Sequence, residues 1–304
     1  MATPLVGTID RVAPADLLAL TKPRIVALVV LTAAAGYAMA LPFVALAVPR
    51  GAAEGWWLLG HALLGTGLVA GGTSALNQLL ERDVDAHMRR TASRPLPSGR
   101  MGPGEAAAFA WSISAAGVLH LALLVNVRTA LLAAATLGVY VFAYTPLKRR
   151  TPLATLVGAV PGALPIVGGW TAAGAPLDAR AGALFAVLFL WQLPHVLALG
   201  WLLRADYARA GLRMPSVDDE SGVASFRQAA LTAAALVPAS LAPVALGMAG
   251  RLYFVAALVL SLGLLGLALD AARAPSPARA RRLFLGTLAW LPALLAVLVT
   301  GSRS

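Results

Sequence analysis

The sequence contains no cysteine, which excludes disulfide bonds, thiolate metal sites and cysteine nucleophiles. It is also poor in charge: 12% of its residues are charged, whereas soluble domains carry about 25%. Hydrophobic residues make up 59% of the 304 positions. A chain with so little charge must bury most of its surfaces or expose them to lipid. We therefore expect a membrane protein rather than a soluble domain.

Two further patterns are missing. The first twenty residues lack the compact basic-then-apolar pattern of a cleavable signal peptide. The net charge is +11, yet the basic residues lie between apolar runs and form no continuous patch of the kind that binds nucleic acid. We expect membrane lipid as a partner and no nucleic acid. The basic residues are then available for membrane topology and for an anionic ligand.

Nine apolar runs have the length of about 20 residues that crossing a bilayer requires. Because lipid offers no hydrogen-bond partner to the backbone, each spanning segment must be a helix. The sequence therefore predicts an all-α, polytopic membrane protein with nine transmembrane helices in a single domain over residues 1–304. The runs cover residues 24–48, 57–81, 107–125, 129–146, 153–171, 181–203, 229–249, 252–270 and 283–300.

An odd number of spans places the two chain ends on opposite sides of the membrane. The side of the N-terminus then carries 19 of the 24 Lys and Arg residues, and the other side carries 5. Cytoplasmic segments are enriched in Lys and Arg, so this asymmetry predicts a cytoplasmic N-terminus. The five basic residues on the other side are Arg50, Arg128, Arg180, Arg251 and Arg303.

Asn77, Glu81 and Asp85 follow one another at intervals of four residues at the end of the second run and just beyond it. On a helix this spacing places three side-chain oxygens on one face, about 6 Å apart along the axis. Two carboxylates and an amide suit a hard cation such as Mg²⁺, which retains some water and is often shared with substrate phosphates. We predict that these three residues are metal ligands for Mg²⁺ and part of a catalytic site.

Arginines follow this motif at once. Guanidinium groups bind phosphate oxygens in a bidentate manner, so the combination predicts a magnesium–diphosphate site. The alternative is a solvated helix end that is stabilised by ion pairs four residues apart, such as Asp85 with Arg89. The arginines are Arg89, Arg90, Arg94 and Arg100.

The sixth run brings a second polar cluster to the same side of the membrane, with His195 followed by Arg204, Asp206 and Tyr207. Two polar clusters on one side predict a shared mouth. An isolated histidine inside an apolar run is commonly a satisfied core residue. An ionisable group within a span is, however, also a candidate functional group.

Basic residues at the ends of two other runs reach the same side. The fourth run is followed by Lys148, Arg149 and Arg150. Lys22 lies just before the first run, and Arg24 is its first residue. Their alternative role is to set the membrane topology.

Several segments resemble a known family. NQLLERDVD followed by RTASRPLPSG resembles the first signature of the UbiA-type prenyltransferase superfamily, Asn-x₃-acidic-x₃-Asp. LTKPRI, YTPLKRRTP, GALPIVGGW and WQLPHVLALGW with RADYARAGLRMP are similar to segments of its heme-modifying branch. The resemblance implies helices around a central cavity in a bacterial inner membrane, Mg²⁺, farnesyl diphosphate and protoheme (heme b) as substrates, and heme O as product. It also implies partners in the heme pathway or in terminal-oxidase assembly.

The resemblance also implies residue roles. Many members carry an acidic DxxxD-like pattern on the sixth helix; here His195 lies near its first acidic position, and Asp206 is the clear carboxylate nearby. We expect His195 to orient the porphyrin or to handle a proton. The resemblance assigns the magnesium–diphosphate to Asn77, Glu81 and Asp85 and the clamping of the diphosphate to Arg90, Arg94 and Lys148, and we add Lys22 and Arg24 as candidates.

Three other functions remain open from the sequence. A prenyltransferase that acts on an aromatic or quinone precursor would share the diphosphate site, although the DxxxD pattern that favours it is missing. A transporter would also contain many helices with polar groups, but we find no inverted repeat and the polar groups lie at one mouth rather than at the midplane. A scaffold for oxidase assembly would not need the magnesium-type spacing.

Overall fold

The computed structural model describes residues 13–44 and 51–301. Arg11, Arg50, Arg303 and the end of the first predicted span lie outside the described residues. The described chain forms helices and connecting turns, with no strand, which confirms the predicted fold class. The helices are α1 (Pro14–Thr21), α2 (Pro23–Val44), α3 (Ala52–Leu80), α4 (Arg82–Ala86), α5 (Pro103–Leu124), α6 (Val127–Gly138), the π-helix η1 (Val139–Tyr144), α7 (Thr145–Leu147), α8 (Ala154–Ala172), α9 (Ala179–Leu202), α10 (Arg204–Arg209), α11 (Pro215–Asp218), α12 (Val223–Ala245), α13 (Arg251–Arg273) and α14 (Pro277–Gly301).

Within the described ranges, eight helical segments are long and apolar enough to cross a membrane: α2, α5, the continuous run α6–η1–α7, α8, α9, α12, α13 and α14. The remaining predicted span corresponds to α3, which has 29 residues and so exceeds the required length. It is not among the eight segments that meet the hydropathy criterion, and it carries His61 in its first half and Asn77 and Gln78 in its last turn.

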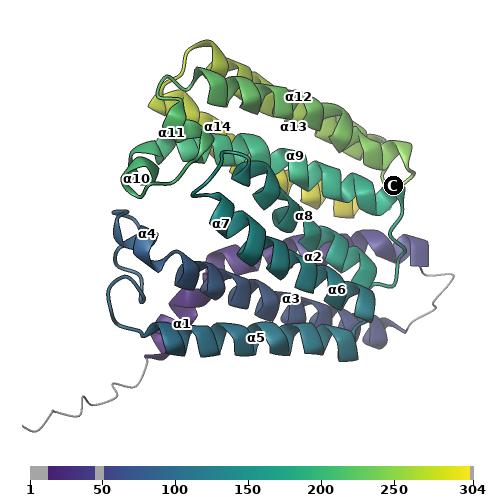
Figure 1. Cartoon of the computed structure of the whole chain (residues 1–304). Helices are drawn as coiled ribbons and strands as arrows, with labels where there is room; N and C mark the ends of the chain where they lie inside the picture. Colours follow the sequence, from purple (N-terminus) through teal and green to yellow (C-terminus); the bar gives the residue numbers. More distant parts are fainter. Residues whose placement is uncertain (1–12, 45–50, 302–304) are drawn as a thin grey trace, which may run out of the picture.

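The bundle consists of two groups of helices (Figure 1). In the first half of the chain α3 packs along α5 and α2, and in the second half α9, α12, α13 and α14 pack against one another. Helix α8 joins the groups because it contacts α2 and α6 on one side and α9 on the other. The space between the two groups is therefore bordered by α2, α3, α6, α8 and α9.

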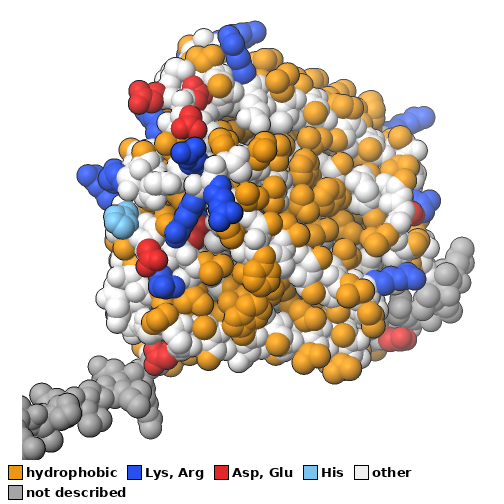
Figure 2. Space-filling view, in the orientation of Figure 1, with side chains coloured by type: hydrophobic (Ala, Val, Ile, Leu, Met, Phe, Trp, Pro, Cys, Tyr) orange, Lys and Arg blue, Asp and Glu red, His pale blue; other side chains and the backbone are white. Residues whose placement is uncertain are grey.

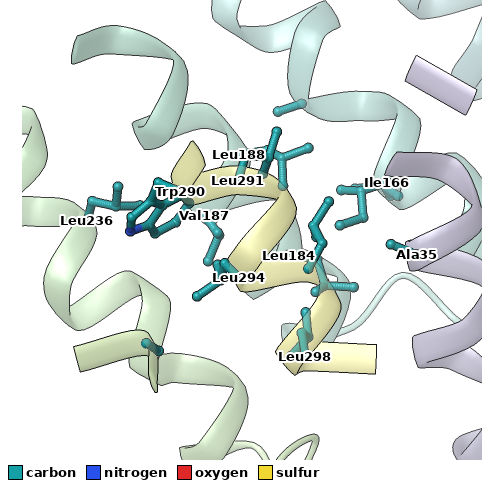
Figure 3. Packing of buried hydrophobic residues seen from close by; sticks show 14 of the residues in the cluster. Ala35, Ile166, Leu184, Val187, Leu188, Leu236, Trp290, Leu291, Leu294 and Leu298 are labelled. Atoms are coloured by element: carbon teal, nitrogen blue, oxygen red, sulfur yellow. The ribbon is translucent and has the colours of Figure 1, made fainter. Parts of the chain in front are cut away.

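The largest core cluster fills the second group and extends into α8, α2 and the start of α3. Leu184, Leu188 and Leu291 interdigitate where α9 meets α14, and Trp290 packs beside Leu236 of α12 (Figure 3). In a bilayer the surrounding lipid tails are as apolar as leucine, so close packing rather than escape from water holds such helices together.

Two glycines allow α2 and α8 to approach closely. A Cβ at Gly36 would lie 1.9 Å from the Ile166 carbonyl oxygen, and one at Gly169 would lie 1.8 Å from the Ala33 carbonyl oxygen. Both contacts are with backbone, which cannot rotate away as a side chain can. Small residues at such crossings are typical of membrane helix pairs.

The short helices α4, α10 and α11 lie together at one end of the bundle (Figure 1). Figure 2 shows hydrophobic side chains over the broad middle of the visible face, with charged side chains gathered towards its two ends and more densely at the end with these short helices. This distribution fits a protein that crosses a membrane with its polar groups at the two surfaces.

Candidate active site

Asn77, Glu81 and Asp85 lie where α3 meets α4. The prediction of one continuous helix is wrong at this point, because α3 ends at Leu80 and Glu81 stands between the two helices. The Glu81 N–H nevertheless donates to the Asn77 carbonyl at 3.0 Å, and the Asp85 N–H donates to the Glu81 carbonyl at 2.7 Å. These bonds keep the three residues in helical register, and all three side chains are buried.

Each of these three side chains contacts its own basic side chain. The nitrogen–oxygen distances are 3.0 Å at the amide, 2.8 Å at the glutamate and 2.5 Å at the aspartate. The cations come from the α1–α2 junction, from the end of α7 and from the loop after α4, so the contacts bring distant parts of the chain together. We call these six residues the polar cluster: Lys22 with Asn77, Lys148 with Glu81, and Arg94 with Asp85.

Each carboxylate of the polar cluster uses one oxygen for its cation. Among the described residues, the ion pairs and side-chain hydrogen bonds of Glu81 and Asp85 use Oε1 and Oδ2, which leaves Glu81 Oε2 and Asp85 Oδ1 without a protein partner. The same part of the chain holds no group of three or more His, Cys, Asp and Glu side chains that could enclose a metal ion. A small number of carboxylate oxygens, as at Glu81 and Asp85, fits Mg²⁺. This ion is commonly held by one or two carboxylates together with water and substrate phosphates.

Lys22 connects the polar cluster to the start of the bundle. Its backbone is left-handed, with φ of 52°, at the position where α1 ends, and its N–H donates to the Ala19 carbonyl as in a left-handed helix cap. Gln78 supports this junction by donating to the Leu20 carbonyl at 2.8 Å. Desolvation, together with the positive charges of Arg94 and Lys148, lowers the pKa of Lys22 to about 7. The crowding of three cations here favours an anionic ligand beside them.

The π-helix η1 supplies aromatic rings next to the polar cluster. The Lys148 Nζ lies 4.4 Å from the centre of the Tyr144 ring, and Tyr140 meets Tyr144 edge-on at 4.9 Å. Thr145 accepts a bond from the Asn77 amide at 3.3 Å and donates to the Tyr140 carbonyl at 2.8 Å. π-Helical turns are rare in proteins, and those that do occur are often found at functional sites.

A cavity of about 350 Å³ adjoins the polar cluster. This volume falls within the range of small-molecule sites, about 300–1,000 Å³. Lys22, Tyr140 and Tyr144 line it at the polar cluster, and its walls come mainly from apolar side chains of α2, α3, α6, α8 and α9. The cavity therefore has one charged end, at the polar cluster, and an apolar remainder between the helices, which we call the apolar chamber.

His195 lines the same cavity, on the side of α9. Its ring lies between Trp191, with centroids 5.3 Å apart, and Phe284, at 5.0 Å. Its Nδ1 is 2.8 Å from the hydroxyl oxygen of Thr287. The structure thus brings His195 to the chamber that adjoins the polar cluster, but not into hydrogen-bond contact with that cluster.

The structure separates the other members of the predicted second cluster. Arg204 stacks on the Trp201 ring and donates to its carbonyl at 2.8 Å, and Asp206 pairs with Arg209. Neither residue is in contact with the polar cluster in the described chain, because each has a local partner. Their membership of a shared mouth stays a prediction. Tyr207 does lie near the site, because it packs against the hydrophobic cluster that includes Val84 and Met88 beside Asp85. Burial raises the pKa of its hydroxyl group.

Two predicted diphosphate ligands, Arg24 and Arg90, are exposed and stand outside the polar cluster. Arg24 lies on the first turn of α2, and Arg90 lies in the loop after α4. Their assignments stay predictions.

Sequence reasoning missed several residues at the site. Tyr144 and Thr145 stand directly before the basic stretch at the end of the fourth span, so their position offered a signal that was not used. Phe284 and Thr287 offered none, because they lie in the last helix, about 90 residues from the histidine that they contact.

The Lys148–Glu81 pair offers a test of the polar cluster. We expect Lys148→Met to lower the melting temperature in detergent, because breaking a buried ion pair leaves an unpaired charge at a cost of up to about 3–5 kcal/mol. The double variant Glu81→Gln/Lys148→Met will melt above Lys148→Met, because it removes both charges. Equal melting temperatures for the single and double variants would contradict this pairing.

Fold and site together define a class: a multi-pass helical membrane protein with a cluster of three basic side chains, two carboxylates and an amide beside an apolar cavity. The UbiA prenyltransferase family matches residues 29–297. The protoheme IX farnesyltransferase of Solibacter usitatus (strain Ellin6076) is 43% identical over 293 residues, which cover 93% of this chain and 97% of that protein. The protoheme IX farnesyltransferase of Anaeromyxobacter sp. (strain Fw109-5) is 46% identical over 289 residues, covering 95% and 94%. The chain belongs to the UbiA prenyltransferase family and is a prenyltransferase.

Solved structures share the fold. The structure of a digeranylgeranylglyceryl phosphate synthase superposes with a TM-score of 0.76 at 15% identity. The superposition covers 95% of this chain and 98% of that one. A UbiA homologue from Archaeoglobus fulgidus bound to GPP and Mg²⁺ gives a TM-score of 0.62 at 18% identity, with coverages of 93% and 99%. At these identities the comparison establishes the fold.

Proposed function

We propose that this protein transfers the farnesyl group of farnesyl diphosphate to a vinyl group of protoheme and so forms heme O. One observation carries the diphosphate part of this function: the polar cluster adjoins an apolar cavity and keeps one oxygen of Glu81 and one of Asp85 without a protein partner. The choice of acceptor rests on the relatives, which are named protoheme IX farnesyltransferases over most of this chain.

The polar cluster would hold the diphosphate. Asn77, Glu81 and Asp85 would bind Mg²⁺, which would neutralise charge on the leaving diphosphate. Arg94 and Lys148 already lie within 2.8 Å of the carboxylates, so each can turn its free N–H groups towards phosphate oxygens. Preorganised donors of this kind stabilise charge as it develops in the transition state. Arg90, Arg24 and Lys22 are further candidates for the diphosphate.

The apolar chamber would hold the farnesyl chain and exclude water. When the carbon–oxygen bond breaks, its electron pair leaves with the diphosphate and an allylic cation remains. Tyr140 and Tyr144 line the cavity beside Lys148, and aromatic faces attract cations. The chamber thus protects the cation until the acceptor attacks.

The acceptor would lie on the side of His195. A vinyl carbon of the porphyrin attacks the cation, and water then adds at the second vinyl carbon and gives up a proton, which yields a hydroxyethylfarnesyl arm. His195 would orient the porphyrin in this step, because Trp191 and Phe284 hold its ring against the cavity. A rival acceptor, an aromatic or quinone precursor, would use the same diphosphate site.

The first experiment is to incubate the purified protein with farnesyl diphosphate, heme b and Mg²⁺ and to analyse the products by mass spectrometry. We expect farnesylated heme that disappears when EDTA is added. Binding of farnesyl diphosphate with Mg²⁺ but without any heme product would retain the diphosphate site and reject the acceptor. Absence of both would reject the whole proposal.

We also propose a bacterial inner membrane as the location, with the polar cluster and the N-terminus on the cytoplasmic side. The unequal division of Lys and Arg between the two sides supports this orientation. Partners in terminal-oxidase assembly would receive the product there.

A further inference from the structure

The hydrogen bonds around His195 determine which ring nitrogen carries the proton. The Thr287 hydroxyl lies 2.6 Å from the Phe284 carbonyl oxygen and 2.8 Å from His195 Nδ1. Two oxygens 2.6 Å apart need a proton between them, and a carbonyl can only accept. The single hydroxyl proton of Thr287 therefore points to Phe284. It follows that His195 Nδ1 carries a proton and donates it to Thr287.

The other ring nitrogen, Nε2, is then unprotonated in the neutral imidazole. Among the described residues, no side chain or backbone group forms a hydrogen bond with it. Because His195 lines the cavity and its Nδ1 is taken by α14, Nε2 is the nitrogen that can meet a bound molecule.

Helix α14 fixes this ring in three ways. Besides the hydroxyl of Thr287, the carbonyl of Thr287 accepts a bond from Trp191 Nε1 at 2.8 Å. Trp191 stacks on one side of the imidazole with 23° between the planes, and Phe284 lies on another side at 33°. The imidazole is therefore held in both its rotation and its tautomer by a helix that contributes nothing to the polar cluster.

A histidine that donates from Nδ1 and keeps Nε2 free has the arrangement of a metal ligand, in which the outer hydrogen bond orients the ring and makes the ligating nitrogen more basic. We propose that Thr287 is a positioning residue that fixes His195 as the Nδ1–H tautomer and so presents Nε2 to the iron of the heme acceptor. This inference rests on the proposed acceptor.

The test uses the full-length protein in detergent with heme b as the probe, and the variants Thr287→Val and Thr287→Ser. Valine has the shape of threonine but accepts no hydrogen bond, whereas serine keeps the hydroxyl. We expect heme affinity to fall about 10–100-fold in Thr287→Val, which is the usual effect of losing an outer-shell partner, and to recover in Thr287→Ser. His195→Ala will lose the absorption spectrum of histidine-ligated heme.

A second readout isolates the hydrogen bond from mere packing. In the reduced heme complex, the iron–histidine stretching frequency rises as the Nδ1–H bond strengthens. Resonance Raman spectra should therefore show a lower frequency in Thr287→Val than in the parent protein, and the parent value in Thr287→Ser. An unchanged frequency in a heme-bound Thr287→Val protein would overturn the inference.

The binding of farnesyl diphosphate with Mg²⁺ serves as the control, because Thr287 does not contact the polar cluster and its variants should bind the diphosphate as the parent does. If the parent itself binds no heme while it binds the diphosphate, the proposed acceptor fails. If the parent binds heme with a histidine ligand and Thr287→Val retains both the affinity and the spectrum, only the role of Thr287 fails. Should Thr287→Val not fold, Thr287→Ala replaces it in the same comparison.

Discussion

Replacing Asp85 by asparagine will reduce prenyl transfer by about 10²–10³-fold, the range found when one charge-stabilising group is removed from an active site. Asp85 is 1% exposed, and its Oδ2 accepts from Arg94 at 2.5 Å while Oδ1 has no partner in the described chain. Asparagine keeps the shape but removes the negative charge that would hold Mg²⁺. Turnover at saturating farnesyl diphosphate, measured across a magnesium titration, gives the size of the loss.

The control is Asp83→Asn, two residues away on the same short helix. The Asp83 side chain is 71% exposed and is paired only with Arg82, at 3.7 Å. Solvent-exposed ion pairs contribute little to the stability of a protein, so this variant should fold normally and retain activity within about twofold. If Asp85→Asn were as active as Asp83→Asn, with both proteins folded, Asp85 would have no part in the reaction.

Gly169→Ala will destabilise the protein strongly, by about 3 kcal/mol, which lies at the upper end for overpacked interiors. The new methyl group would stand 1.8 Å from the Ala33 carbonyl oxygen. Since this contact is with backbone, α2 and α8 must move apart. Both helices line the cavity, so we expect activity to fall together with the melting temperature in detergent.

The neighbouring glycine provides a matched control. A Cβ at Gly168 would meet no atom within 4 Å, and alanine favours a helix over glycine by about 1 kcal/mol. Gly168→Ala should therefore melt at or above the temperature of the parent protein. Equal losses in the two variants would mean that the close approach of α2 and α8 is not what limits stability.

The arrangement of spans follows from the sequence because the bilayer imposes a length and excludes unpaired backbone groups. Eight predicted spans meet the same criteria in the structure. The α3 helix is the exception: it does not meet the same hydropathy criterion, and Asn77 and Gln78 in its last turn bond to the polar cluster and to the α1–α2 junction.

Contacts between distant helices lay beyond the sequence. The interval of four residues from Asn77 to Asp85 could be read directly, but their partners Lys22 and Lys148 are 55 and 67 residues away from the groups that they meet. Charge at a helix end can serve topology, a local ion pair or a site, and only packing distinguishes these roles. Lys148 and Asp206 are both charged residues near the end of an apolar span, so the sequence does not distinguish their roles. In the structure Lys148 joins the polar cluster, whereas Asp206 pairs with Arg209.

The order in which the chain emerges from the ribosome matters for this protein. All members of the polar cluster have been synthesised once residue 148 is added, whereas two partners of His195, Phe284 and Thr287, arrive only with α14, the last helix. At about 5–20 residues per second, the two events are separated by a time on the order of ten seconds. During that interval the nascent chain contains every residue of the charged pairs, while the imidazole has neither its hydrogen-bond acceptor Thr287 nor the Phe284 ring. A chain that ends before residue 284 would therefore contain every member of the polar cluster but lack the residues of α14 that orient the histidine.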